Sequence, residues 1–300
     1  MHSSSKFRSF ARYHVLVALL FGVTACTTAN RPDLGGMTFS SDPLLGKVIW
    51  HDLVTEDLSG ARDFYGGLFG WEFEKSTGTR GEDYVLARQG GLLVAGLLEV
   101  DVPDDDKDYS RWLPYVSVAD VDTAVSRTRT AGGTVVATAR NVGIGRVAAV
   151  LDPQGAVIGL ARSSIGDPDD RTTAPGVGKP VWTELLADDP QAAAAFYSAL
   201  IPYQVKAIER RGGEYLYLAS DGVDRAGIFQ KPASDEYAAT WLTAFGVEDP
   251  GAAAAKAESL GGKIIVPASA DLRDGTIAVV TDPAGAILVL QAWHSTGAES

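Results

Sequence analysis

The sequence predicts an α+β fold in which two copies of one domain follow each other along the chain. Three observations support this prediction: a set of landmarks recurs after about 130 residues, which is a domain-sized period; each copy divides into two similar halves; and each half pairs one helix with several short strands. The recurring landmarks are Trp50 and Trp182, Phe64-Tyr65 and Phe196-Tyr197, Trp112 and Trp241, Gly132-Gly133 and Gly261-Gly262, and the turns that begin at Asp152-Pro153 and Asp282-Pro283.

The first half of each copy is predicted as a strand, a helix and three further strands. The helix begins after Asp57 in the first copy and after Asp189 in the second, because Asp is a favoured N-cap and Pro190 suits the first helical position. The expected strands cover residues 47–54, 71–75, 84–89 and 92–100 in the first copy, and 180–186, 204–209, 214–220 and 225–230 in the second.

The second half repeats this plan. Its first strand covers 112–118 or 241–247. The helix begins at Asp120 or Asp122 in the first copy and at Asp249-Pro250 in the second, and a glycine pair at its end suits a left-handed C-cap. A strand and a hairpin follow, and the Asp-Pro-x-Gly turns fit type I geometry. The body is therefore expected to contain four βαβββ units in two pairs.

The N-terminus has the features of a targeting segment. Residues 1–14 are basic, residues 15–23 form an apolar run too short to span a bilayer, and small residues precede Cys26. This arrangement resembles a bacterial lipoprotein signal, in which acyl chains such as palmitate are attached to the cysteine after cleavage. An ordinary secretory signal with an incidental cysteine is the alternative. Thr27 after the cysteine favours the outer membrane, on its periplasmic side, if the organism has one.

These features predict the domain boundaries. Residues 1–25 form the signal peptide, 26–46 a lipid-bearing cysteine with a flexible tether, 47–162 the first domain, 163–178 a linker and 179–293 the second domain. Loss of the signal would remove three basic residues and no acid, which changes the formal net charge from −12 to −15. Such an acidic chain is not expected to bind nucleic acid, since affinity for phosphate backbones depends on Lys and Arg.

Four segments are typical of the repeated unit: DLVTEDLSGARDFYGGLFGW, ELLADDPQAAAAFYSAL, YVSVADVDTAVSRTRTAGGTVV and GRVAAVLDPQGAVIGL. With these segments the chain resembles the vicinal oxygen chelate superfamily, which includes glyoxalase I, bleomycin-resistance proteins and extradiol dioxygenases. The resemblance implies that each pair of units curls its sheet into a cup with helices outside. It also implies a metal ion in the cup of the enzymes, held by His, Glu or Gln side chains on the first and last strands.

The metal-ligand positions of this chain hold the wrong residue types. They fall on side chains that cannot bind a divalent ion, namely Trp50, Trp182, Leu113, Leu242, Gly159 and Val289. Glu99 and Gln230 are the only candidates on the last strands of the first and third units, and His51 lies one residue from a ligand position. Strand alternation turns His51 away from the face of Trp50, unless a bulge intervenes. We therefore expect no cofactor, with a divalent metal held by His51 and Glu99 as the alternative.

A pair of residues recurs where the metal ligand is missing. Trp50-x-Asp52 returns as Trp182-x-Glu184, and each pair places an indole and a carboxylate on one face of a strand. Such a pair suits a small, partly apolar ligand of neutral or positive charge. Packing of the indole in an emptied cup is the alternative. Trp112 and Trp241 are expected at the rim.

Three functions remain open from the sequence. The first is a lipid-anchored envelope protein that binds a small molecule in a metal-free cup. The second is a metal-dependent lyase, isomerase or dioxygenase that uses His51, Asp52, Glu99 or Glu184. The third is protein association alone. Whether the chain is an enzyme stays undecided, and a monomer with two pseudo-symmetric domains is expected.

Overall fold

The computed structural model describes residues 34, 37–76, 84–101, 110–170, 176–210, 213–232 and 238–293. Each sequence copy forms one eight-stranded mixed sheet, and each sheet contains two βαβββ units, as predicted. The predicted signal peptide and Cys26 lie outside the described residues. Within the described ranges, no helix is long and apolar enough to cross a membrane.

The first sheet has the strand order β2-β3-β4-β1-β5-β8-β7-β6. The two units meet where β1 pairs antiparallel with β5, and each of these strands pairs in parallel with the last strand of its own unit. The elements are β1 (Val48–Thr55), α3 (Leu58–Phe69), β2 (Glu72–Lys75), β3 (Tyr84–Gln89), β4 (Leu92–Glu99), β5 (Arg111–Ser117), α4 (Val121–Thr130), β6 (Thr134–Val142), β7 (Gly145–Leu151) and β8 (Val157–Ser163).

The second sheet repeats this topology with the order β10-β11-β12-β9-β13-β16-β15-β14. A short 3-10 turn, η1 (Arg273–Gly275), interrupts its last unit. The other elements are β9 (Pro180–Ala187), α5 (Pro190–Leu200), β10 (Gln204–Arg210), β11 (Gly213–Ser220), β12 (Val223–Gln230), β13 (Thr240–Val247), α6 (Pro250–Ser259), β14 (Lys263–Val266), β15 (Ile277–Thr281) and β16 (Ile287–Ala292).

The predicted helix caps are confirmed. Asp57, Asp189 and Asp249 each accept a hydrogen bond from a backbone N–H of the first helical turn, and Asp120 rather than Asp122 caps α4. These caps satisfy backbone donors that have no partner within the helix. The sequence therefore determines where the four helices of the described residues begin.

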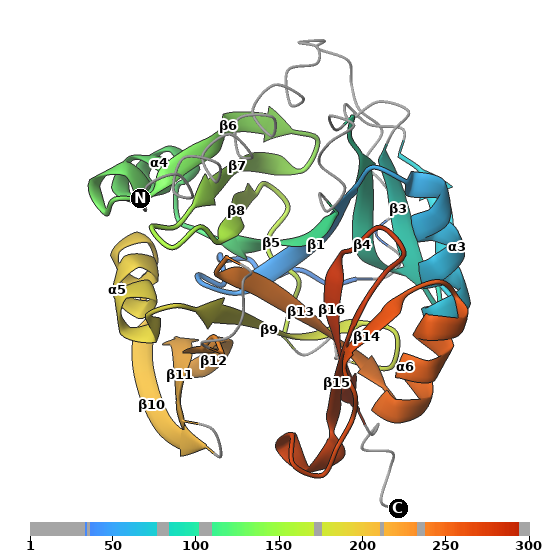
Figure 1. The fold of residues 1–300 in the computed structure, drawn as a ribbon. Helices are drawn as coiled ribbons and strands as arrows, with labels where there is room; N and C mark the ends of the chain where they lie inside the picture. The colour runs from blue at the N-terminus through green and yellow to red at the C-terminus, as the bar shows by residue number, and fades with distance from the viewer. Residues whose placement is uncertain are drawn as a thin grey trace, which may run out of the picture.

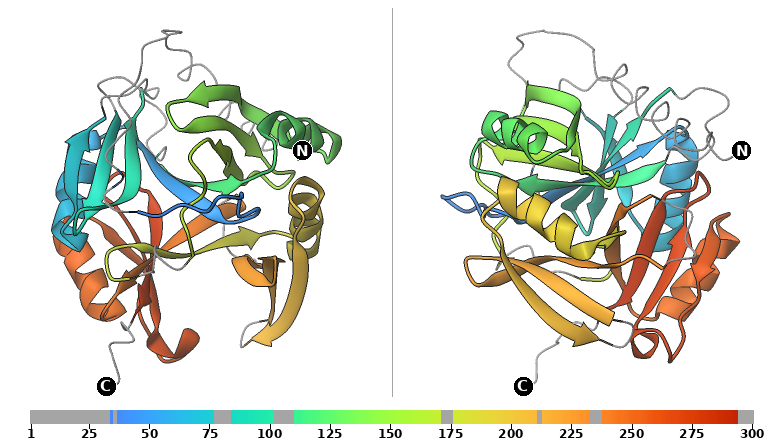
Figure 2. Two further views of the ribbon diagram at one scale, coloured as in Figure 1. Left: turned by 180° about the vertical axis from the view of Figure 1, so that it is seen from behind. Right: turned by 60° about the vertical axis from the view of Figure 1, so that its left-hand side comes forward.

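The two sheets curl into cups that open in opposite directions, and the helices lie on the faces away from the cups (Figures 1 and 2). The helices pair across the copies, α3 with α6 and α4 with α5. Consequently there are two large cores, and each combines one half of the first copy with the opposite half of the second. The apolar face of each unit is thus buried against a unit of the other copy.

A chain of polar contacts links the copies inside each core. The Trp112 indole Nε1 donates to the Tyr65 hydroxyl at 3.0 Å, and that hydroxyl donates to Asp282 Oδ2 of the second copy at 3.1 Å. The reciprocal chain runs from Trp241 through Tyr197 to Asp152, with both distances 2.9 Å. The landmarks that recur in the sequence are therefore the residues that hold the two copies together.

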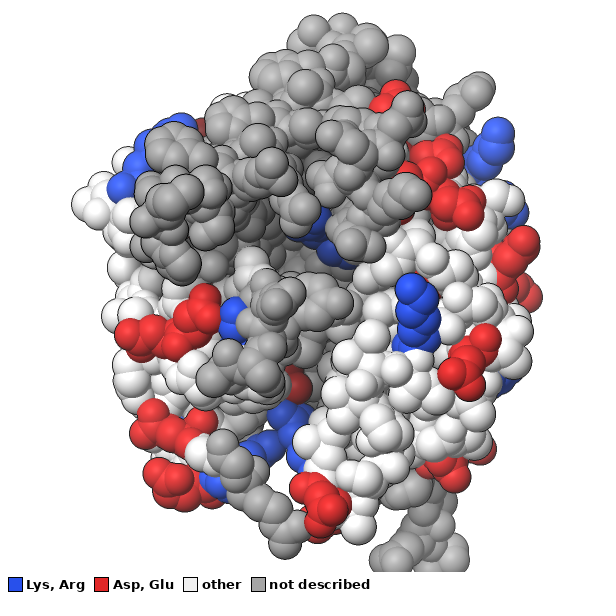
Figure 3. Space-filling model, viewed as in Figure 1, with Lys and Arg blue, Asp and Glu red and all other residues white. Residues whose placement is uncertain are grey.

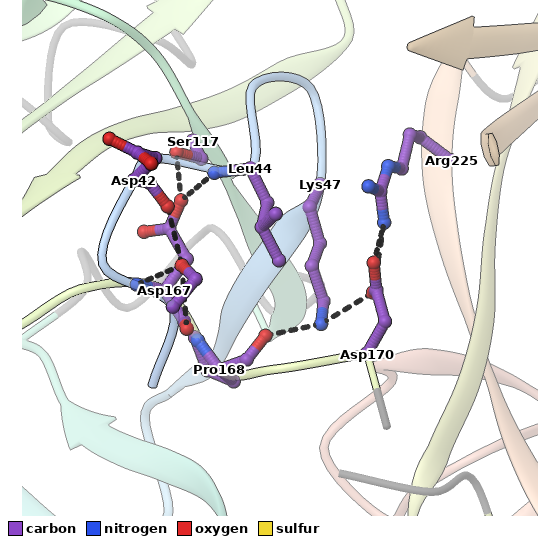
Figure 4. Close-up of polar contacts among 9 residues, drawn as sticks. Asp42, Leu44, Lys47, Ser117, Asp167, Pro168, Asp170 and Arg225 are labelled. Carbon is purple, nitrogen blue, oxygen red and sulfur yellow. Dashed lines mark hydrogen bonds and ion pairs between the residues drawn. The ribbon is translucent and has the colours of Figure 1, made fainter. Parts of the chain in front are cut away.

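The segment before β1 is docked along the linker between the copies. The Asp167 carboxylate accepts hydrogen bonds from the Leu44 amide at 2.7 Å and the Ser117 hydroxyl at 2.6 Å, and the Ser40 amide donates to the Asp167 carbonyl (Figure 4). The sequence predicted a flexible tether up to residue 46. In the structure, residues 37–46 instead lie against the first domain and the linker, where the amides of Ser40 and Leu44 donate to the buried Asp167.

We expect the buried Asp282 to make stability depend on pH. Burial raises its pKa from 3.8 to about 6, so the folded state binds a proton more tightly than the unfolded chain does. The free energy of unfolding should therefore fall as the pH rises from about 4 to 6, by about 3 kcal/mol from this group. D282N should lose this contribution. Urea titrations of both proteins between pH 4 and 7 would test it, and a constant difference between them would contradict it.

Removal of one tyrosine hydroxyl should weaken the contact between the copies. Y65F leaves the Trp112 indole and the Asp282 carboxylate in the core without their shared partner, so we expect a loss of about 1–3 kcal/mol of stability. Y197F should have a similar effect, since Tyr197 links Trp241 to Asp152 in the same way. Chemical denaturation of the two variants provides the measurement. An unchanged free energy of unfolding in both Y65F and Y197F would show that these two series of hydrogen bonds contribute nothing to stability.

Candidate functional site

The floor of the first cup carries a buried polar cluster. The Trp50 Nε1 and the Tyr84 hydroxyl both donate to Asp52 Oδ1, each at 2.8 Å. Asp52 is 1% exposed, while Trp50 is half-buried. Gly96 faces Asp52 on the adjacent strand, where a methyl group would overlap the Tyr84 hydroxyl and the carboxylate. The cluster thus requires a glycine at this point of β4.

The second cup repeats the cluster and adds a cation. The Trp182 Nε1 donates to the Tyr215 hydroxyl at 2.9 Å, and this hydroxyl donates to Glu184 Oε2 at 3.0 Å. The Arg273 Nη2 forms an ion pair with the same oxygen at 2.8 Å. Gly227 leaves room for the Tyr215 hydroxyl as Gly96 does for Tyr84. Each predicted Trp and carboxylate pair therefore lies on one cup face.

The tyrosines that complete these clusters were not predicted from the sequence. Tyr84 and Tyr215 recur at the start of the hairpin, and Gly96 and Gly227 recur on its second strand. The same self-comparison could have found both pairs. Arg273 has no counterpart in the first copy, so no repeat signal marks it.

The two cups differ in how much of their centre is filled. In the first cup, the Tyr115 ring occupies the place where a side chain at Gly159 would lie. At the equivalent positions of the second cup stand Ala244 and Val289. Leu34 and Met37, from the segment before β1, also pack against the cluster that contains Trp50. The first cup is therefore more crowded than the second.

The walls of the second cup are aromatic and basic. The Arg210 guanidinium lies 4.2 Å from the centre of the Tyr215 ring, and Arg273 lies 5.7 Å from that of Phe229. Trp182 packs edge-on against Tyr217. The surface is hollowed at this end of the molecule, and Lys and Arg side chains gather there (Figure 3). Two cations and one buried carboxylate thus surround a partly exposed aromatic surface.

The backbone is strained where it places the cation. Arg273 and Asp274 have φ values of 47° and 55°, a region that residues other than glycine seldom adopt. Strain of this kind persists only where the surroundings enforce it, and it is common at ligand sites. Burial acts to lower the pKa of Arg273, but the charge and hydrogen bonds of the Glu184 carboxylate act against it, and the pKa is raised. The guanidinium is thereby held, fully charged, at the cup floor.

Burial keeps the phenol of Tyr215 protonated. Loss of solvent raises its pKa well above 10, and the charge of Glu184 adds to this effect. A neutral phenol can donate its single proton to the carboxylate and accept one from the indole. Tyr215 therefore acts as a fixed link between Trp182 and Glu184.

The residues of the cups do not fit the metal ion that the superfamily resemblance implies. Leu113 lies in the apolar cluster on the cup face of the first copy, and Leu242 and Val289 lie in that of the second. Among the residues that the structure describes, no group of three or more His, Cys, Asp or Glu could hold a metal. The carboxylates of Asp52 and Glu184 are instead engaged by indole, phenol and guanidinium donors.

The alternative metal candidates lie apart from the cups. The His51 Nε2 is 3.2 Å from Thr183 Oγ1, its own counterpart in the second copy, and burial lowers the pKa of this histidine to about 4. Glu99 accepts a hydrogen bond from the Leu58 amide at the start of α3. Gln230 donates to backbone carbonyls at the end of β9. None of the three faces Asp52 or Glu184.

The other two predicted site residues lie on the opposite face of the sheets. The Trp112 and Trp241 indoles are buried in the two large cores, on the helix side. Each donates to a core tyrosine, as described above, rather than lining a rim. The reason is strand alternation, which points Leu113 and Leu242 into the cups and their neighbours away.

Comparisons with known proteins agree with this fold. The chain is 33% identical over 246 residues to "Putative glyoxylase CFP32" of Mycobacterium tuberculosis, covering 81% of this chain and 93% of that protein. It is 30% identical over 254 residues to "Anthracycline biosynthesis protein DauV" of Streptomyces sp. strain C5, covering 80% and 91%. Among solved structures, the Mn(II)-bound glyoxalase from Novosphingobium aromaticivorans has a TM-score of 0.54 at 15% identity, covering 83% of this chain and 82% of that one.

A sequence model of one superfamily matches both repeats, over residues 47–160 and 179–290. The fold, the repeat and the relatives agree with this match. The chain belongs to the Glyoxalase/Bleomycin resistance protein/Dioxygenase superfamily.

Proposed function

We propose that the second cup binds a small planar molecule without a metal ion. One observation carries this proposal. A series of polar contacts links Trp182, Tyr215, Glu184 and Arg273 at the floor of a partly exposed apolar cup. The indole offers a flat surface, and the guanidinium offers hydrogen-bond donors to an oxygen of the ligand. A few fixed polar groups in an apolar hollow are typical of small-molecule sites.

The charges favour a neutral or anionic ligand. A carboxylate alone would attract a cation, as the sequence suggested, but Arg273 already neutralises Glu184. Arg210 on the cup wall then adds a second positive charge. Only the Nη2 of Arg273 bonds to Glu184 among the described residues, which leaves Nε and Nη1 for a ligand oxygen. The names of relatives such as DauV make an anthracycline a sensible probe beside simpler aromatic compounds.

We also propose that Cys26 anchors the chain to a bacterial membrane, on the basis of the N-terminal sequence alone. Two or three acyl chains would hold the protein stably, since one chain binds only marginally. Mass spectrometry of the protein from a bacterial host should show an acylated cysteine at the new N-terminus. C26S should leave the membrane fraction. An unmodified wild-type cysteine would contradict this proposal.

Ligand binding should depend on the second cup. In a thermal-shift and titration screen of benzoate, phenol, benzylamine and an anthracycline, we expect benzoate or the anthracycline to raise the melting temperature of the metal-free protein. R273Q should weaken that binding about tenfold or more, as expected for the loss of a charged hydrogen bond. Quenching of tryptophan fluorescence should also decrease in W182F.

The first cup supplies the matched control. D52N alters the equivalent carboxylate and should leave ligand affinity unchanged. Equal losses in D52N and R273Q would contradict a site in the second cup. Elemental analysis of the purified protein completes the test, because a stoichiometric transition metal would favour a metal-dependent lyase, isomerase or dioxygenase instead.

A further inference from the structure

A cavity lies where the two copies meet, and the tryptophans of the two cups, Trp50 and Trp182, both reach its lining. Its volume is about 340 Å³, at the lower end of the range for small-molecule sites. The lining comes from the beginnings of β1 and β9, from the hairpin strands β4 and β12, and from the linker between the copies. Because both copies contribute equivalent elements, the cavity exists only in the assembled pair.

Most of the lining is apolar. Val48, Leu92 and Leu93 line it from the first copy, and Val181 and Val223 from the second. His51 and Thr183 also border the cavity, and their mutual hydrogen bond joins the two copies beside it. A hydrocarbon body would therefore be favoured in this space over bulk water.

Three cationic side chains also line the cavity, and one acid is shared between two of them. Asp170 of the linker forms ion pairs with Lys47 at 2.8 Å and with Arg225 at 2.9 Å (Figure 4). Lys179 forms no ion pair with any residue in the described ranges. The other acid of the lining, Asp224, is paired with Lys206. The lining thus contains three cationic side chains and two acidic ones, a net charge of one positive unit.

Arg225 carries a donor without an acceptor. Its side chain is 5% exposed, and its Nη1 bonds to both oxygens of Asp170, yet its Nε finds no partner among the described residues. Buried guanidinium donors are nearly always satisfied, because an unmet one loses its hydration without compensation. An acceptor supplied by a bound molecule would complete it.

From this combination we propose that the cavity binds a small carboxylate with an apolar body. The carboxylate accepts from the Arg225 Nε and pairs with Lys179, and the hydrocarbon part lies against the valine and leucine side chains. The site shares Trp182 with the cup of the second copy but none of Tyr215, Glu184 and Arg273, and it does not depend on the function proposed for that cup. The bound anion would contact both copies and the linker at once.

Hexanoate is a suitable probe, with hexanol as the control that has the same hydrocarbon body and no charge. Calorimetric titration of the full chain should show saturable binding of one hexanoate, and hexanol should bind at least tenfold more weakly. K179Q should weaken hexanoate binding about tenfold, since it removes a cation that makes no ion pair in the described structure. R225K keeps a charge for Asp170 but lacks Nε, so it should weaken binding by a similar factor.

Two further variants make the result specific. K263Q removes an exposed lysine of β14 that does not line the cavity, and R273Q alters the second cup; both should bind hexanoate as the wild type does. Absence of saturable binding at millimolar hexanoate would overturn the proposal. Equal affinity for hexanol, or unchanged affinity in both K179Q and R225K, would overturn it as well. Loss of hexanoate binding in R273Q would place that ligand in the cup instead.

Discussion

The two reciprocal chains of tryptophan, tyrosine and aspartate hold the molecule together. Each begins on the first strand of a second unit, passes through the helix of a first unit and ends at the Asp-Pro-x-Gly turn of the other copy. All three groups are buried, so each needs the others to satisfy its hydrogen-bonding capacity. The helices, and with them the cups on the far faces of the sheets, are positioned by this arrangement.

Duplication has left two similar cups with different contents. Both retain an indole, a phenol and a carboxylate, and both retain the glycine that lets the phenol reach the carboxylate. The first cup is filled by Tyr115 and by residues from the segment before β1, whereas the second contains Arg273 on a strained turn. The two cups therefore differ in a few residues, while the strand order of the two sheets is the same.

The fold was largely predictable because its signals are local. Aspartate caps, glycine pairs and alternating strands specify the elements, and the repeat specifies their grouping. The partners of Tyr65 and Tyr197 were not predictable, since nothing local shows that a tyrosine in one copy meets an aspartate in the other. At the candidate site, the Trp and carboxylate pairs followed from strand alternation. Arg273 did not, because its position depends on a turn with unusual backbone angles, and Trp112 and Trp241 were expected on the wrong face.

The sharing of both cores between the copies has a consequence for biosynthesis. During translation the first copy is synthesised before the second, which supplies half of each core. The apolar faces of α3 and α4 therefore stay uncovered until α5 and α6 have been made. Exposed surface of this kind makes an emerging chain prone to aggregation. Either copy made alone would therefore expose the apolar faces of its helices, and the first copy covers them only once the second has been synthesised and has folded against it.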